Sequence, residues 1–101
     1  MISIETLEKI KKTFEGRGFK GRIIPEVNRE FTLSVNKEVE LGIEVTIYFY
    51  QDERIDINFP AMVKNVEQAF MFKELYNDAM DCLAISINAI NFTIKQDSEG
   101  K

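Results

Sequence analysis

The side chains best suited to chemistry in this chain are carboxylates and phenols gathered between residues 38 and 56. They are Glu38, Glu40, Glu44, Tyr48, Tyr50, Asp52, Glu53 and Asp56. Paired carboxylates can act as acid and base, but one of them must be desolvated to hold a proton at neutral pH. Only the two tyrosines could enclose these acids, so a solvated surface is the plainer interpretation. The sharper one is a binding face, with acids spaced along strands and tyrosines as packing anchors.

Several kinds of catalysis are excluded by composition. The chain has no histidine, and therefore lacks the usual general base near neutral pH and the usual metal ligand. The carboxylates of Asp52, Glu53 and Asp56 match no calcium-loop spacing and lack the glycine that such loops use. Cys82 is the single cysteine, and its apolar neighbours favour a buried filler over a reactive thiol. We expect a non-enzymatic protein without metal or cofactor; a small carboxylate enzyme or ligand carrier is the weaker alternative.

A basic segment at residues 16–22 carries the letters of a G-x-G-x-x-G motif. That fingerprint needs a strand before it and a helix after it, whereas here a predicted helix precedes and a predicted strand follows. What remains is a loop in which Arg17, Lys20 and Arg22 could bind a phosphate or an RNA backbone. The plainer interpretation is that the glycines end a helix and the charges solvate the surface.

Polar and apolar residues alternate from Val27 to Phe59, with the apolar side chains at odd positions. This period predicts strands with one buried and one exposed face. An earlier strand is expected at about 19–24, turns at 28–29 and 36–37, and a hairpin loop at 51–54. Short turns join antiparallel neighbours, so the strands should form a four-stranded meander. Within it, Glu38, Glu40 and Glu44 are expected on the exposed face of the third strand.

Helices are predicted on both sides of this meander. Ser3 can cap a first helix, whose buried stripe would be Ile4, Leu7, Ile10 and Phe14, and glycines 16 and 18 would end it. Asn65, followed by Gln68, predicts a capping box before a long helix over 66–94. Residues 85–95 also alternate and are rich in β-branched side chains, so a terminal strand is the alternative there. The expected fold is α+β, in the order α-β-β-β-β-α, as a single domain over 1–101 with a polar tail at about 96–101.

The long helix should be apolar on two sides. The sheet can cover one side, and the second side is a strip formed by Met71, Leu75, Cys82, Ile85 and Ala89. The first helix offers only four large apolar residues, too few to cover a long strip. We therefore expect this strip to be the interface of a homodimer.

Charge is distributed unevenly along the chain. Residues 1–37 hold eight Lys/Arg and five Asp/Glu, a net of +3, and residues 38–101 hold five and twelve, a net of −7, which gives the total of −4. We expect an inhibitor or regulator whose acidic sheet face meets a basic, nucleic-acid-binding site on a larger protein. This profile is loosely similar to that of small phage or mobile-element proteins that block host nucleases and defence systems. The alternative is a nucleic-acid or phosphate-ligand binder that uses the basic loop.

The surroundings expected for the protein follow from a few further features. The first residues lack the basic and apolar stretches of a signal peptide, and no apolar run approaches the ~20 residues that cross a bilayer. The lone cysteine suits a reducing compartment. We expect a cytoplasmic protein with no membrane partner.

Overall fold

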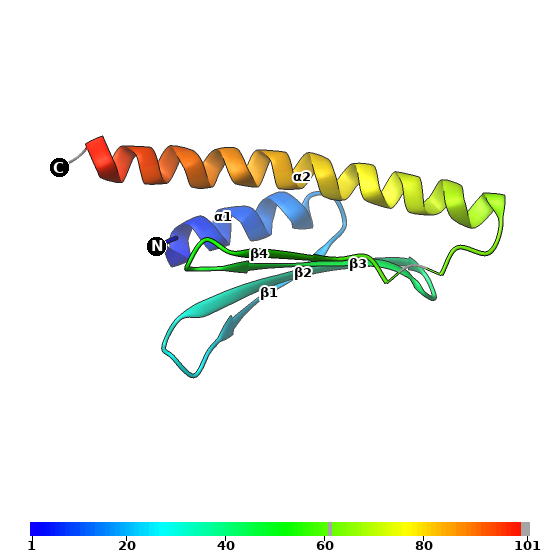
Figure 1. Ribbon diagram of the computed structural model, residues 1–101, viewed down its shortest axis with the longest axis horizontal. Helices are drawn as coiled ribbons and strands as arrows, with labels where there is room; N and C mark the ends of the chain where they lie inside the picture. The colour runs from blue at the N-terminus through cyan, green and yellow to red at the C-terminus, as the bar shows by residue number, and fades with distance from the viewer. Residues whose placement is uncertain (61, 100–101) are drawn as a thin grey trace.

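The structure of the protein is a computed structural model that describes residues 1–60 and 62–99. Two helices flank four strands along the chain (Figure 1): α1 (Ile4–Glu15), β1 (Lys20–Pro25), β2 (Phe31–Glu40), β3 (Ile43–Tyr50), β4 (Ile55–Asn58) and α2 (Val66–Glu99). The strands form one antiparallel sheet in the order β1-β2-β3-β4. The predicted α+β meander with a short first and a long last helix is therefore confirmed.

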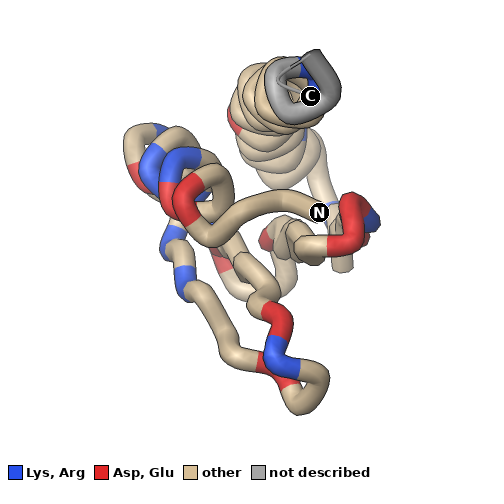
Figure 2. Tube along the Cα trace, turned by 90° about the vertical axis from the view of Figure 1, so that its left-hand side faces the viewer, with Lys and Arg blue, Asp and Glu red and all other residues tan. Residues whose placement is uncertain are grey.

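Both helices lie on the same side of the sheet, with α1 toward β1 and β2 and α2 over β3 (Figures 1 and 2). The core fills the space between helices and sheet, and the odd-numbered strand residues supply its floor: Leu33, Val35, Ile43, Val45, Ile47 and Phe49. From α1, Leu7, Ile10 and Phe14 close the core above them. The face turned away from the helices, called the outer face below, carries the even-numbered residues and is covered by neither helix.

The hairpin between β2 and β3 turns later than its residues suggested. The turn predicted at 36–37 is wrong; the chain reverses at Leu41 and Gly42, where the glycine takes a φ of 84° that disfavours other residues. Away from the turn even residues of β2 pair with even residues of β3, as Glu38 does with Glu44, because a β-bulge between Glu38 and Glu40 offsets the two-residue turn. The alternation therefore continues through the turn without a break, and the pattern could not reveal it.

The first helix begins and ends as its sequence predicts. The Thr6 backbone N–H donates to the Ser3 hydroxyl at 3.1 Å, which caps the helix. Gly16 is the C-cap, and Gly18 adopts a φ of 86°. Ile4 differs from its prediction, because its side chain is exposed while that of Thr6 is buried in the stripe.

The second helix is longer than predicted. The Gln68 backbone N–H donates to the Asn65 side-chain oxygen at 2.8 Å, so Asn65 caps it as expected. Residues 85–95 are helical, which settles the alternative of a terminal strand. The helix runs to Glu99, so most of the tail predicted to fray is helical, and residues 100–101 lie outside the described part. Across residues 1–60 and 62–99, neither helix has the length and apolar content needed to cross a membrane.

The strip predicted to be a dimer interface is mostly buried within the single chain. Leu75 and Cys82 are each only 1% exposed, because α1 and the sheet together cover the middle of the helix. Met71 and Ala89 are partly buried, and only Ile85 is well exposed. The interface prediction is therefore wrong at its centre. The arc that the core covers includes small residues, Ala79 and Ser86, which a search for large apolar side chains overlooks.

Candidate functional site

A row of polar side chains crosses the outer face from one edge of the sheet to the other. The strand register places Arg22, Ser34, Tyr48 and Asp56 directly opposite one another on successive strands. Residues that pair directly share a face, and the neighbouring odd positions fill the core. Tyr48 therefore lies near the middle of the outer face, with a cation on β1 to one side and a carboxylate on β4 to the other.

Tyr50 contacts three neighbouring side chains on this face. Its ring stacks beside that of Tyr48 with 6.5 Å between centroids, and its hydroxyl donates to Asp56 Oδ2 at 3.0 Å. The Arg54 guanidinium lies over the same ring, 4.6 Å from the centroid. Partial burial, followed by the hydrogen bond to Asp56 and the charge of that carboxylate, raises the pKa of Tyr50 above 10.0. The phenol is thus held neutral, as an amphipathic surface with one apolar ring and one polar tip.

The loop between β3 and β4 uses its charges within the chain. The backbone N–H of Arg54 donates to Asp52 Oδ1 at 3.1 Å, and the guanidinium Nε donates to Oδ2 at 2.8 Å. The backbone hydrogen bond is the largest of the causes that lower the pKa of Asp52. Glu53 adopts a φ of 76° and lies 3.6 Å from the amino group of Met1. Both predicted partner-binding acids of this loop therefore sit at the sheet edge, already engaged but exposed.

A shallow hollow of about 390 Å³ opens beside Tyr50, between the β1–β2 turn and the ends of β2 and β3. Its walls include Glu26, Val27, Glu30, Phe31, Tyr50 and Arg54. Gln51 anchors the floor, because its side chain accepts from the Phe31 N–H at 2.7 Å and donates to the Ile2 carbonyl at 2.9 Å. The sequence offered no signal for this hollow, which depends on how far the β1–β2 turn projects from the sheet.

The three glutamates predicted on one strand are divided between two. Glu38 on β2 lies directly opposite Glu44 on β3, and the Asn36 amide donates to Glu44 Oε2 at 3.2 Å. A β-bulge after Glu38 then places Glu40 opposite Ile43, whose side chain lies in the core. Glu40 therefore does not continue the acidic row. The prediction that the three acids share one face of one strand is wrong for this reason.

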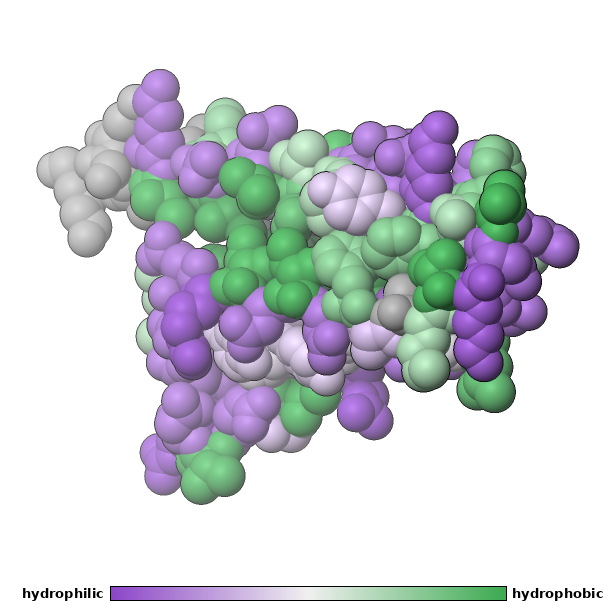
Figure 3. Space-filling view, turned by 45° about the vertical axis from the view of Figure 1, so that its right-hand side comes forward, coloured by the Kyte–Doolittle hydropathy of each residue, from purple (hydrophilic) through white to green (hydrophobic). Residues whose placement is uncertain are grey.

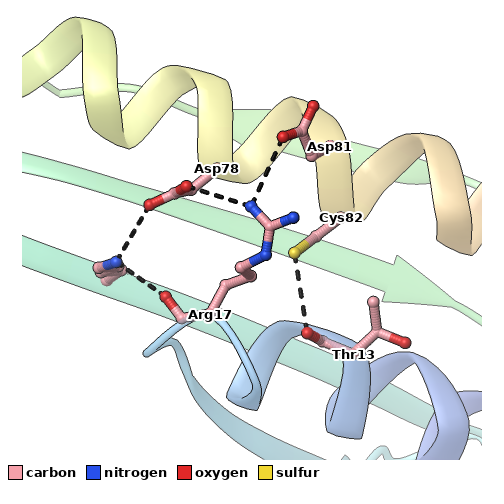
Figure 4. Close-up of polar contacts among 6 residues, drawn as sticks. Thr13, Arg17, Asp78, Asp81 and Cys82 are labelled. Atoms are coloured by element: carbon pink, nitrogen blue, oxygen red, sulfur yellow. Dashed lines mark hydrogen bonds and ion pairs between the residues drawn. The ribbon is translucent and has the colours of Figure 1, made fainter.

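The predicted cluster of cations is also divided. Lys20 and Arg22 lie on the outer face of β1, opposite Asn36 and Ser34. Arg17 turns the other way, toward α2, where its Nη1 lies 3.3 Å from Asp78 and 3.5 Å from Asp81 (Figure 4). The three basic side chains therefore do not form one phosphate site.

The contacts around Arg17 join α1, β2 and α2 at one corner of the core. Lys37 Nζ donates to the Arg17 carbonyl at 2.8 Å and lies 3.3 Å from Asp78. The Cys82 thiol faces the Thr13 carbonyl at 3.7 Å (Figure 4). Burial raises the pKa of this thiol, which disfavours the reactive thiolate.

Charge on the outer face is mixed rather than uniformly acidic. Figure 2 shows mixed charges along α1 and basic segments along β1 on one side of the molecule, and mostly acidic ones at the β3–β4 loop on the other. Lys20 and Arg22 share the outer face with Glu38, Glu44 and Asp56. Among the residues that the structure describes, no group of three or more Asp, Glu or Cys side chains could hold a metal ion.

These features are what the chain itself offers for assigning a function. No protein-family model, curated protein or solved structure matches it.

Proposed function

We propose that this chain is a non-enzymatic protein–protein interaction module, an inhibitor or regulator, which binds a larger protein through its outer face. The observation that carries the proposal is the pair of stacked tyrosines, Tyr48 and Tyr50, on the one sheet face that neither helix covers. Aromatic side chains held in place by neighbours are the usual anchors of protein interfaces. The hydrogen bond to Asp56 orders the pair before a partner arrives.

The chemistry of the partner follows from the acids around these rings. Glu38, Glu44 and Asp56 frame the tyrosines on the three strands beyond β1, and the segment from residue 38 onward carries a net charge of −7. Such an array favours a surface rich in Lys and Arg. We take a basic, nucleic-acid-binding site as the target, because carboxylates spaced along strands can occupy the places of phosphates.

The biological context and the cellular compartment are part of the same proposal. A target of this kind fits the action of small phage or mobile-element proteins against host defence nucleases. The free, buried Cys82 suits the reducing cytoplasm. Self-association is also part of the proposal, because two outer faces in one assembly would bind a repeated target with higher avidity.

Affinity capture from cell extract followed by mass spectrometry tests the proposal. The wild type is compared with the Tyr48→Ala, Glu44→Lys double variant, and with Glu67→Lys as a control on the exposed side of α2. We expect one partner that the wild type and the control retain, that the double variant loses, and that dissociates with rising salt. Equal capture by all three proteins would refute the outer face as the binding surface.

A second candidate function rests on the position of Lys20 and Arg22. Both share the outer face with Tyr48, and cations beside stacking rings are typical of single-strand nucleic-acid binding. Fluorescence anisotropy with a short RNA at low salt measures it directly. A salt-sensitive rise that the Lys20→Ala, Arg22→Ala variant abolishes would establish this function over the first; no rise would remove it.

A further inference from the structure

A continuous band of hydrophobic residues runs between α2 and the edge strand β4 (Figure 3). This apolar band is defined by Ile57, Phe59, Phe72, Tyr76 and Ile87. Phe59 contacts Phe72 and Tyr76, with ring centroids 5.9 and 5.6 Å apart. Ile57 is 42% exposed and Tyr76 is 44% exposed. Contiguous apolar surface of this kind marks an interaction site in a folded protein.

The core face of the sheet reaches the solvent at β4. Ile57 pairs with Ile47, which is fully buried, so both side chains belong to the face that the helices cover. Ile57 nevertheless remains exposed, because neither helix extends over this edge. The core is thus open on the β4 side, and closed by α1 on the β1 side.

The backbone of β4 is also free to pair. The Tyr50 N–H donates to the Arg54 carbonyl at 3.0 Å, which sets the phase of the ladder between β3 and β4. Antiparallel pairs alternate, so Asp56 bonds toward β3, whereas Ile55 and Ile57 direct their N–H and C=O groups outward. By contrast, the other edge strand carries Lys20 and Arg22 and ends in a proline, features that discourage edge pairing.

We propose that a second copy of this chain docks on the apolar band, with the two β4 strands antiparallel and a twofold axis at Ile57. Charge disfavours the neighbouring register. An axis at Asp56 would place the two Asp56 carboxylates directly opposite each other, which is unfavourable. An axis at Ile57 places Asp56 opposite the partner's Asn58, and pairs the outward backbone groups of the two Ile57 residues. The result is one sheet continuous through both copies.

Apolar residues on the β4 side of α2 are spaced symmetrically about one point of the helix. Tyr76, Met80, Leu83 and Ile87 follow the spacing of four, three and four residues that is typical of helix–helix seams. A twofold axis normal to the sheet makes the two α2 helices antiparallel. In that arrangement Tyr76 faces the partner's Ile87 and Met80 faces the partner's Leu83, so the seam maps onto itself about a point between Met80 and Leu83.

The two centres coincide along the molecule. Ile55 lines a hollow with Ile87 and Ile90, and Phe59 contacts Phe72 and Tyr76. Ile57 lies midway between Ile55 and Phe59, so along the molecule it is level with the midpoint of the helical seam. A foreign strand or helix would not require this coincidence, whereas an isologous dimer requires both elements to share one axis.

Charge on α2 also favours a second copy. The helix positions that point out over the β4 side are Lys73, Tyr76, Met80, Ala84, Ile87 and Asn91. None is acidic, although the helix carries Glu67, Glu74, Asp78 and Asp81 on its other sides. Two copies of an acidic protein can therefore approach on this side without opposing carboxylates.

Light scattering on a sizing column, with the full chain at micromolar concentration, tests the inference. We expect about twice the single-chain mass of 11.7 kDa. Ile87→Lys should reduce the mass to that of one chain. Ile85→Lys is the matched control, because the same residue type is exposed on the same helix but points away from β4, and it should remain dimeric. Circular dichroism verifies that both variants are folded.

Ile57→Pro supplies an independent arm on the strand. In a single chain the backbone N–H of Ile57 points to solvent, so its loss should leave the fold intact. The same loss should block pairing between the β4 strands of two copies. The inference would be overturned if the wild type were a monomer, if the dimer survived Ile87→Lys, or if only Ile85→Lys dissociated it. In the first case the apolar band would be left for a different protein. The inference rests on the self-association part of the proposed function alone, so loss of partner capture does not affect it.

Discussion

The hydroxyl of Tyr50 donates a hydrogen bond of 3.0 Å to Asp56 across the β3–β4 hairpin, from the last residue of β3 to the edge strand β4. The guanidinium of Arg54 lies over the ring, and Tyr48 stacks beside it. The ring is thus restrained by three neighbours in the free protein. A side chain that is already ordered loses less conformational entropy on binding, which makes it a better anchor than a mobile one.

The first prediction concerns the ionisation of Tyr50. Its pKa should lie above 10.0, and Asp56→Ala should lower it without restoring the ordinary value, because burial is the largest cause of the shift. The stability that neutral Tyr50 contributes is complete below pH 10 and is lost as the pH rises through its folded pKa. The NMR shift of the Tyr50 ring Cζ against pH measures this. Glu67→Gln, on the exposed side of α2, is the control and should leave the titration unchanged.

The second prediction concerns the core. Phe49 is fully buried and packs edge-on against Phe14 at 5.7 Å. Phe49→Ala should lower the free energy of unfolding by about 3–5 kcal/mol, since it removes apolar contacts and leaves a cavity. Urea unfolding followed by circular dichroism gives the value. Leu41→Ala at the exposed turn should change it by no more than about 0.5 kcal/mol. A similar loss in both variants would contradict the assigned core.

Much of this fold was predictable from local sequence, because burial and strand geometry impose a period of two. Phe49 and its odd-numbered neighbours were assigned to the core correctly. The same regularity concealed the Gly42 turn, since the bulge beside the turn keeps even residues paired with even ones along the rest of β2 and β3. The bulge that displaces Glu40 left no local signal either, because it depends on how two strands meet.

Local sequence patterns could not predict which groups the long charged side chains contact. Arg17 lies three residues before the start of β1, yet it turns to Asp78, sixty-one residues further along the chain. That choice depends on how α2 crosses α1, which no pattern in residues 16–22 records. Parity alone assigned Tyr48 and Tyr50 to the exposed face. The basic residues of β1 could be placed on that face only from the strand register.

The third prediction concerns this corner of the molecule. Asp78→Ala removes contacts to both Arg17 and Lys37 and should lower the free energy of unfolding by about 1 kcal/mol, since the groups are partly exposed. The loss should shrink at high salt. Asp81→Ala should cost less, because this more exposed carboxylate reaches only Arg17, at 3.5 Å. A double-mutant cycle of Arg17→Ala with Asp78→Ala measures the coupling, and strict additivity would show that the contact contributes nothing.

The fourth prediction joins stability to the proposed function. Glu38 and Glu44 are directly opposite on adjacent strands, and like charges in this position destabilise a sheet. Glu38→Lys replaces repulsion by attraction, so it should raise the free energy of unfolding by about 0.2–1 kcal/mol. The same change removes a carboxylate from the outer face, so it should weaken binding to a basic partner.

Glu40→Lys is the matched control for this trade-off. Glu40 lies opposite Ile43 rather than another acid, so its replacement should alter stability less and leave the acidic row intact. Urea unfolding and partner capture are measured on the same three proteins. A gain in stability with unchanged capture would show that the opposed glutamates are not needed for binding. A gain with loss of capture is the expected result, because repulsion that remains in the free protein is relieved when a basic partner neutralises both acids.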